Sequence, residues 1–151
     1  MDAYITSTKI ILSDMQTNEL MIGDWLIPYN EIEPRKVVSL GYQYDMAGKY
    51  DCVAFEGTPH TLNYTGFCKP IPLTPEILEK NGFVKLWNQY VLKADKEPFI
   101  HLISLDNLPN ANGRMLVAIK DRYTNAKIAI TYVHELQHAL RSCKIEKENK
   151  L

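Results

Sequence analysis

Short apolar runs separated by turn-forming residues dominate the first half of the chain. Runs such as Trp25-Leu26-Ile27 and Cys52-Val53-Ala54-Phe55 lie beside glycines. Apolar runs of this length, bounded by glycine, are typical of β-strands. The pattern therefore predicts a small, strongly bent sheet over residues 15–73, an SH3-like β-barrel-like half in which Trp25 is expected to pack in the core.

The second half of the chain mixes helical and strand-like patterns. Thr74 can cap a short helix, Pro75 suits its first turn and Gly82 can end it. Strand-like runs follow at residues 83–87, 90–93, 99–105, 115–119 and 127–130, and helical spacing covers residues 132–143. Neighbouring strands with short connections favour antiparallel pairing. We therefore expect an α+β protein, with an α+β subdomain over residues 74–145.

Both ends of the chain differ from these two parts. Residues 1–14 precede the first recognisable pattern and are interpreted as an N-terminal extension. Residues 146–151 are rich in lysine and glutamate and are interpreted as a charged, solvated tail.

Charge and cysteine content exclude several classes of protein. The chain has 151 residues, with 17 basic and 18 acidic side chains and a formal net charge of −1. A nucleic-acid-binding surface usually shows a basic stripe, which is absent here. Three cysteines that are far apart predict no disulfide framework, so we expect a cytoplasmic protein. No apolar stretch approaches the ~18 residues that a membrane helix needs.

Residues 134–138 read His-Glu-Leu-Gln-His. In this HExxH pattern two histidines one helical turn apart can bind zinc while the glutamate acts on the metal-bound water. One hypothesis is therefore a zinc-dependent metallopeptidase in which His134 and His138 hold the metal and Glu135 is catalytic.

The surroundings of the motif favour a packing helix over a zinc site. On a helical wheel both histidines lie opposite the apolar arc, so we expect them to face solvent. A catalytic zinc also needs a third protein ligand, and no motif marks His60, His101 or Cys68 for that role. We therefore interpret the motif as non-catalytic and expect no cofactor. The apolar arc consists of Tyr132, Val133, Leu136, Ala139, Leu140 and Cys143.

Three segments resemble the landmarks of a family of small uncharacterised proteins from gut bacteria and their phages. They are Thr-Asn-Glu-Leu-Met-Ile-Gly-Asp-Trp at residues 17–25, Pro-Ile-Pro-Leu-Thr-Pro-Glu-Ile-Leu at 70–78 with Asn-Gly-Phe at 81–83, and Tyr-Val-His-Glu-Leu-Gln-His at 132–138. The resemblance covers about residues 15–145 and implies an origin in a phage or mobile element. In that family the last landmark tolerates glutamine at the position of Glu135, which implies that it is not a zinc site.

Three tyrosines offer a different kind of site. Tyr42, Tyr44 and Tyr50 surround Gly41 and Gly48 in what the pattern predicts to be a polar loop. Exposed aromatic rings are typical of protein interfaces and of grooves that hold extended peptides. We therefore expect a non-enzymatic accessory or binding protein with a protein partner. Nucleic-acid binding through the N-terminal half is a weaker alternative.

Overall fold

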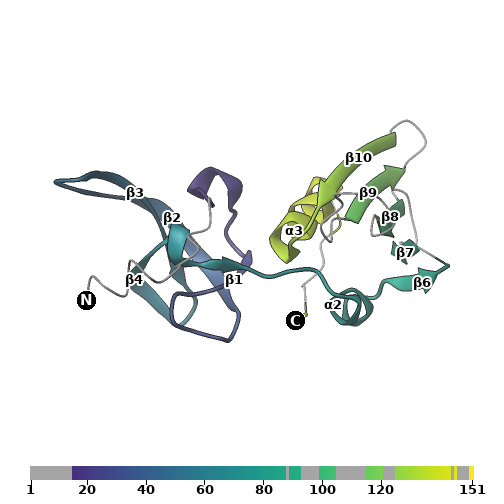
Figure 1. The fold of residues 1–151 in the computed structure, drawn as a ribbon, viewed down its shortest axis with the longest axis horizontal. Helices are drawn as coiled ribbons and strands as arrows, with labels where there is room; N and C mark the ends of the chain where they lie inside the picture. Colours follow the sequence, from purple (N-terminus) through teal and green to yellow (C-terminus); the bar gives the residue numbers. More distant parts are fainter. Residues whose placement is uncertain are drawn as a thin grey trace, which may run out of the picture. The chain divides into compact units, whose positions relative to one another are not determined.

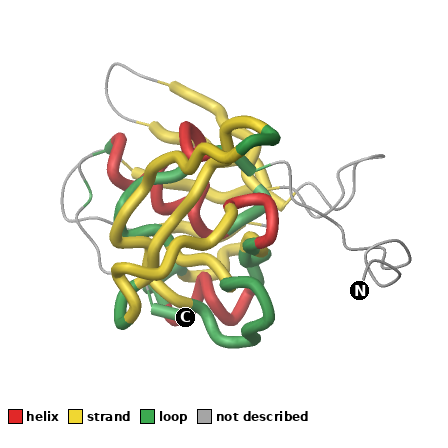
Figure 2. The backbone as a smooth tube through the Cα atoms, turned by 90° about the vertical axis from the view of Figure 1, so that its left-hand side faces the viewer, coloured by secondary structure: helices red, strands yellow, loops and turns green. Residues whose placement is uncertain are grey.

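The computed structural model describes residues 15–87, 89–92, 99–104, 115–120, 125–143, 145, 150 and 151. Between residues 99 and 128 it describes the backbone only. The protein belongs to the α+β class. It forms two compact units, Met1–Ile71 (unit 1) and Pro72–Leu151 (unit 2), both built mainly from antiparallel strands (Figures 1 and 2). The sequence placed this division two residues later. Residues 72 and 73 belong to unit 2 because Leu73 donates its N–H to the carbonyl of Thr131 at 3.0 Å.

Unit 1 is a five-stranded sheet in the order β4-β3-β2-β1-β5. Its strands are β1 (Trp25–Ile27), β2 (Arg35–Asp45), β3 (Gly48–Phe55), β4 (Thr58–Tyr64) and β5 (Lys69–Pro70), with two 3-10 helices, η1 (Thr17–Glu19) and η2 (Thr65–Phe67). One face of this sheet carries an apolar core of Leu20, Leu26, Val37, Val53, Phe55 and Cys68. The expected barrel-like closure of this sheet stays a prediction.

Strands β2 and β3 continue beyond the rest of the sheet as a two-stranded ribbon, here called the arm (residues 41–51). Among the described strands, β4 pairs with β3 only from Cys52 onward, whereas β2 and β3 stay paired as far as Asp45 and Gly48 (Figure 1). The Asp45 carboxylate stabilises the turn by accepting the N–H groups of Ala47 at 2.6 Å and Gly48 at 3.2 Å. The predicted polar loop is therefore wrong. The segment reads as polar because both faces of a two-stranded ribbon meet water.

Unit 2 is a five-stranded antiparallel meander in the order β10-β9-β8-β7-β6. Its strands are β6 (Val84–Leu86), β7 (Gln89–Leu92), β8 (Phe99–Ser104), β9 (Met115–Lys120) and β10 (Asn125–Ile130). Every strand pairs with its neighbour in sequence, so only local hairpin connections are needed.

Helix α2 (Pro75–Lys80) begins and ends as its sequence predicts. The Thr74 hydroxyl accepts the N–H of Ile77 at 3.3 Å, and Gly82 adopts a φ of 84° after the last turn. Phe83 then returns its N–H to the carbonyl of Leu78 at 3.0 Å, which directs its ring toward the interior of the unit.

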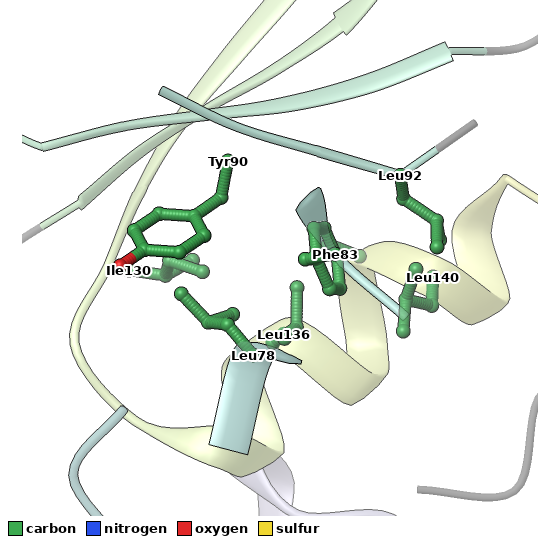
Figure 3. Packing of buried hydrophobic residues seen from close by; sticks show 8 residues of the cluster. Leu78, Phe83, Tyr90, Leu92, Ile130, Leu136 and Leu140 are labelled. Carbon is green, nitrogen blue, oxygen red and sulfur yellow. The ribbon is translucent and has the colours of Figure 1, made fainter. Parts of the chain in front are cut away.

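Helix α3 (Val133–Ser142) packs with α2 and the sheet around one core. The predicted apolar arc contributes Leu136, Ala139 and Leu140 to this core, and Cys143 packs against it. Figure 3 shows the ring of Phe83 in the middle of these side chains. The other buried members are Leu78, Phe83, Tyr90, Leu92 and Ile130. No helix in the described part of the chain is long and apolar enough to cross a membrane.

The end of the chain is attached to unit 2 at one described point. The side chain of Asn81 donates to the carbonyl of Lys150 at 2.6 Å and accepts the N–H of Lys150 at 2.8 Å. Asn81 is 2% exposed whereas Lys150 is exposed, so this pair of hydrogen bonds is partly buried. The backbone at residue 150 is therefore held by unit 2 and is not part of a freely solvated tail. The pattern of charges cannot reveal this contact, because Asn81 and Lys150 are distant in sequence. Residues 146–149 and 1–14 lie outside the described part of the chain.

Candidate functional site

The glutamate of the His-Glu-Leu-Gln-His motif makes a hydrogen bond at the start of α3. Glu135 is the third residue of the helix, and its Oε2 accepts the N–H of Thr131 at 3.1 Å. A carboxylate at this position satisfies one of the unpaired N–H groups near the helix start and complements the helix dipole. Glu135 therefore has a structural task that does not require a metal.

The histidines do not both face solvent, so that expectation is wrong. His134 is 5% exposed, and its ring stacks on Tyr132 with 5.9 Å between centroids and 8° between planes. The ring of His138, which is partly exposed, meets His134 edge-on at 5.8 Å. Gln137 is also buried. The helical wheel failed because it assumes one buried face, whereas the polar side of α3 is also largely covered.

No third metal ligand accompanies the two histidines in the described structure. Among the described residues, no group of three or more His, Cys, Asp or Glu side chains is arranged to hold a metal ion. Cys68 is 1% exposed in the apolar core of unit 1, and burial raises the pKa of its thiol to about 12. His60 belongs to β4 of unit 1 and is exposed, and the side chain of His101 lies outside the described part. The absence of zinc stays a prediction.

Unit 1 carries a row of four aromatic rings, here called the aromatic row. Tyr29 and Phe67 lie 5.2 Å apart, Phe67 and Tyr64 6.1 Å, and Tyr64 and Tyr50 5.2 Å, all measured between ring centroids. Neighbouring planes are tilted by 47° to 51°. Tyr29 is 44% exposed and Tyr64 37%, so the row lies at the surface and leaves ring area for a ligand.

An open groove of about 880 Å³ runs beside three rings of this row. It forms where β4 ends at Tyr64 and η2 turns the chain away from β3. The buried hydroxyl of Thr65 holds this corner by donating to the carbonyl of Met15 at 2.9 Å. The groove is lined by Met15, Gln16, Asp45, Lys49, Tyr50, Asp51, Tyr64, Thr65, Gly66 and Phe67. Its volume is in the range of ordinary ligand sites.

The carboxylate of Asp45 makes one wall of the groove acidic. Tyr50 and Asp45 share one face of the arm, because Tyr50 pairs with Gln43 and Asp45 follows Gln43 by two residues. Burial and then the negative charge of Asp45 raise the pKa of the Tyr50 hydroxyl. Asp51 lies on the other face of the arm, where its carboxylate accepts the N–H of Thr17 at 2.8 Å. A shift in this direction means that the groove disfavours an additional negative charge.

The three predicted tyrosines do not form one site. Tyr50 lies in the aromatic row, whereas Tyr42 and Tyr44 pair in register with Asp51 and Lys49 on the opposite face of the arm. The ammonium of Lys49 lies 3.5 Å from the ring centroid of Tyr42. Tyr44 is 72% exposed and lines no part of the groove.

The sequence pattern did not identify Tyr64 and Phe67, because Tyr64 ends β4 and Phe67 ends η2, and only the pairing of β4 with β3 brings them beside Tyr50. An available signal was the pattern Tyr64-Thr65-Gly66-Phe67, in which two rings flank a turn.

The first landmark of the family resemblance has a structural task. Asp24 is completely buried and accepts the N–H of Met21 at 2.8 Å, while its own carbonyl accepts the N–H of Val37 at 2.9 Å. Trp25 is only partly buried, with the Lys36 ammonium 5.3 Å from its ring centroid, so the expectation that it fills the core is wrong. Leu26 points into the core instead, because neighbouring residues of a strand face opposite sides.

Comparison with known proteins adds no assignment, since no family model, no curated protein and no solved structure matches the chain.

Proposed function

We propose that this protein is a non-enzymatic binding protein whose unit 1 holds an extended segment of a protein partner along the aromatic row. The observation that carries this proposal is the set of four neighbouring rings, partly exposed, beside an open groove. Aromatic side chains contribute most to the free energy of binding when a partner buries them. A row of rings at the surface therefore indicates an area that a partner covers.

The dimensions of the row suit an extended peptide. Centroids that are 5.2 to 6.1 Å apart over four rings match roughly five residues of an extended chain, at about 3.3 Å per residue. Side chains of such a segment can lie in the spaces between tilted rings, as in other modules that bind extended peptides.

The same geometry disfavours the other functions. Asp45 would repel a phosphate backbone in the groove. The alternative function is that of a zinc peptidase. It is disfavoured because the carboxylate of Glu135 accepts the N–H of Thr131. Cys52, Cys68 and Cys143 are free thiols, which supports a place in the reducing cytoplasm. The proposed origin in a phage or mobile element rests on the family resemblance.

A selection of random twelve-residue peptides on the intact protein tests the binding function. Tyr64→Ala removes the central ring of the row and serves for counter-selection. Tyr44→Ala is the matched control, since it removes an exposed tyrosine on the opposite face of the arm. We expect peptides that bind the parent protein and Tyr44→Ala equally but bind Tyr64→Ala at least about tenfold more weakly. Failure to recover any Tyr64-dependent peptide would overturn the proposal.

A further inference from the structure

The acidic wall and the aromatic row meet at Tyr50, and this meeting indicates what chemical group the groove takes. Tyr50 lines the groove together with Asp45, which shares its face of the arm, and with Tyr64, whose ring is 5.2 Å away. An occupant at this end therefore meets ring faces and a carboxylate together. The chemistry of the partner segment can be inferred from this end of the groove, and that inference rests on the proposed peptide-binding function.

The cation of the groove's own lysine is directed elsewhere. Lys49 contributes to the lining, but its ammonium lies 3.5 Å from the centroid of Tyr42. Tyr42 and Lys49 belong to the face of the arm opposite Tyr50, because Tyr42 pairs with Asp51 and Lys49 with Tyr44, whereas Tyr50 pairs with Gln43. By the same register Asp51 also belongs to that opposite face, so Asp45 is the charged residue of the lining that shares the face of Tyr50.

The carboxylate of Asp45 can accept a further hydrogen bond. Its Oδ1 already accepts the N–H groups of Ala47 and Gly48, but an ionised carboxylate has about four acceptor positions. Asp45 is also exposed, so a ligand can reach it.

Ring faces carry partial negative charge and attract cations that lie over them. Within unit 1 this attraction already operates between Lys36 and Trp25, and between Arg35 and Phe55 at 5.7 Å. A guanidinium combines the two requirements of the groove, since it is planar, stacks on aromatic rings and presents a fork of N–H donors to a carboxylate. An ammonium is a compact, strongly hydrated charge that cannot stack in this way.

We infer that the groove selects a partner segment with an arginine, whose guanidinium lies on the rings of Tyr50 and Tyr64 and donates to Asp45. The remaining rings, Phe67 and Tyr29, take apolar side chains of the same segment. A partner chosen in this way is a basic, extended protein segment, not an acidic one.

The test uses synthetic copies of the best Tyr64-dependent peptide from the random selection. In one copy each arginine in turn is replaced by citrulline, which has nearly the same shape but no charge, and in another by lysine. Isothermal titration calorimetry then measures binding to the parent protein, to Asp45→Asn and to Glu56→Gln. Asparagine at position 45 keeps an oxygen for the two turn N–H groups, and Glu56 is an exposed carboxylate outside the groove, so Glu56→Gln controls for loss of one negative charge.

We expect one position at which citrulline weakens binding by about tenfold or more and lysine by less. Asp45→Asn should cause a similar loss, and the two changes together should cost less than the product of the separate losses, because they remove one shared contact. Glu56→Gln should have no such effect.

The other outcomes separate this inference from the proposed function. Tyr64-dependent peptides that contain no arginine, or that bind equally well with citrulline or lysine, would overturn the arginine specificity and leave the peptide-binding function supported. Recovery of no Tyr64-dependent peptide would overturn both.

Discussion

Units 1 and 2 use aromatic side chains in opposite ways. Phe83 in unit 2 is 2% exposed at the centre of the core (Figure 3). Phe67 in unit 1 is only partly buried and contacts two other surface rings. Both residues directly follow a glycine near a short helical segment, since Phe67 follows Gly66 within η2 and Phe83 follows Gly82 after α2. The residue type and its local setting are therefore similar, and the surroundings decide the difference.

The difference follows from what each unit has to cover its sheet. In unit 2, α2 and α3 supply Leu78, Leu136 and Leu140 to the same cluster as Phe83. The described part of unit 1 has only η1 and η2, each of three residues, as helical segments. Segments this short cannot cover a sheet, so rings at the sheet margin stay available for another molecule.

Replacement of a phenylalanine by alanine should lower the free energy of unfolding more in unit 2 than in unit 1. We expect Phe83→Ala to lower the free energy of unfolding by about 3–5 kcal/mol, because it leaves a cavity in a closed core. Phe67→Ala should cost only about 1 kcal/mol, since it removes two surface ring contacts. Urea titrations followed by circular dichroism measure both values. Equal costs would show that the aromatic row is part of a core and not an open surface.

Leu136→Ala should lower the stability of unit 2 by about 2–5 kcal/mol. Leu136 is 2% exposed and lies on the apolar arc of α3. Denaturant titration provides the measurement. A cost below about 1 kcal/mol would mean that α3 is not the packing element that closes this core.

Loss of the partly buried contact between Asn81 and Lys150 should cost an intermediate amount. Asn81→Ala removes both hydrogen bonds to the backbone of Lys150 and one to the carbonyl of Ile77, and we expect a loss of about 1–3 kcal/mol. Thermal denaturation of this variant is compared with the same substitution in a chain that lacks residues 150 and 151. If the cost is the same in both chains, the end of the chain does not contribute to unit 2.

A substitution at the β6–β7 turn should raise stability. Trp87 is 95% exposed and has a φ of 56°, which a side chain with a β-carbon adopts at a cost. Trp87→Asn should gain about 0.5–1 kcal/mol, because asparagine tolerates this conformation far better. Trp87→Ala is the control, since it removes the same ring but keeps the strain. A gain in the alanine variant as large as in the asparagine variant would indicate that ring exposure and not backbone strain is the cause.

The smallest change in stability is expected for Glu135, the residue that a zinc peptidase would use for catalysis. Glu135→Gln should alter stability by less than about 0.5 kcal/mol, because an amide oxygen can still accept the N–H of Thr131. Denaturant titration measures this, together with metal content after dialysis and a peptide-cleavage assay with added zinc. Zinc-dependent cleavage by the parent protein that is lost in Glu135→Gln would establish the peptidase and overturn the non-enzymatic interpretation.

Local sequence was sufficient for the elements and their order. Thr74, Pro75 and Gly82 determine α2 because capping and positive φ depend on residues within a few positions. The strands of unit 2 could be predicted because a meander pairs each strand with its neighbour in sequence. The apolar arc of α3 likewise identified Leu136 and Leu140 as core residues.

Contacts between distant residues were decided only by the tertiary structure. Tyr50 meets Tyr64 because β4 ends opposite Cys52, and nothing near either tyrosine in sequence determines that register. Asn81 and Lys150 are 69 positions apart, and the burial of His134 depends on neighbours that a helical wheel does not contain. Sequence patterns report which face of one element is apolar, whereas a binding site or a covered polar face depends on which elements the chain brings together.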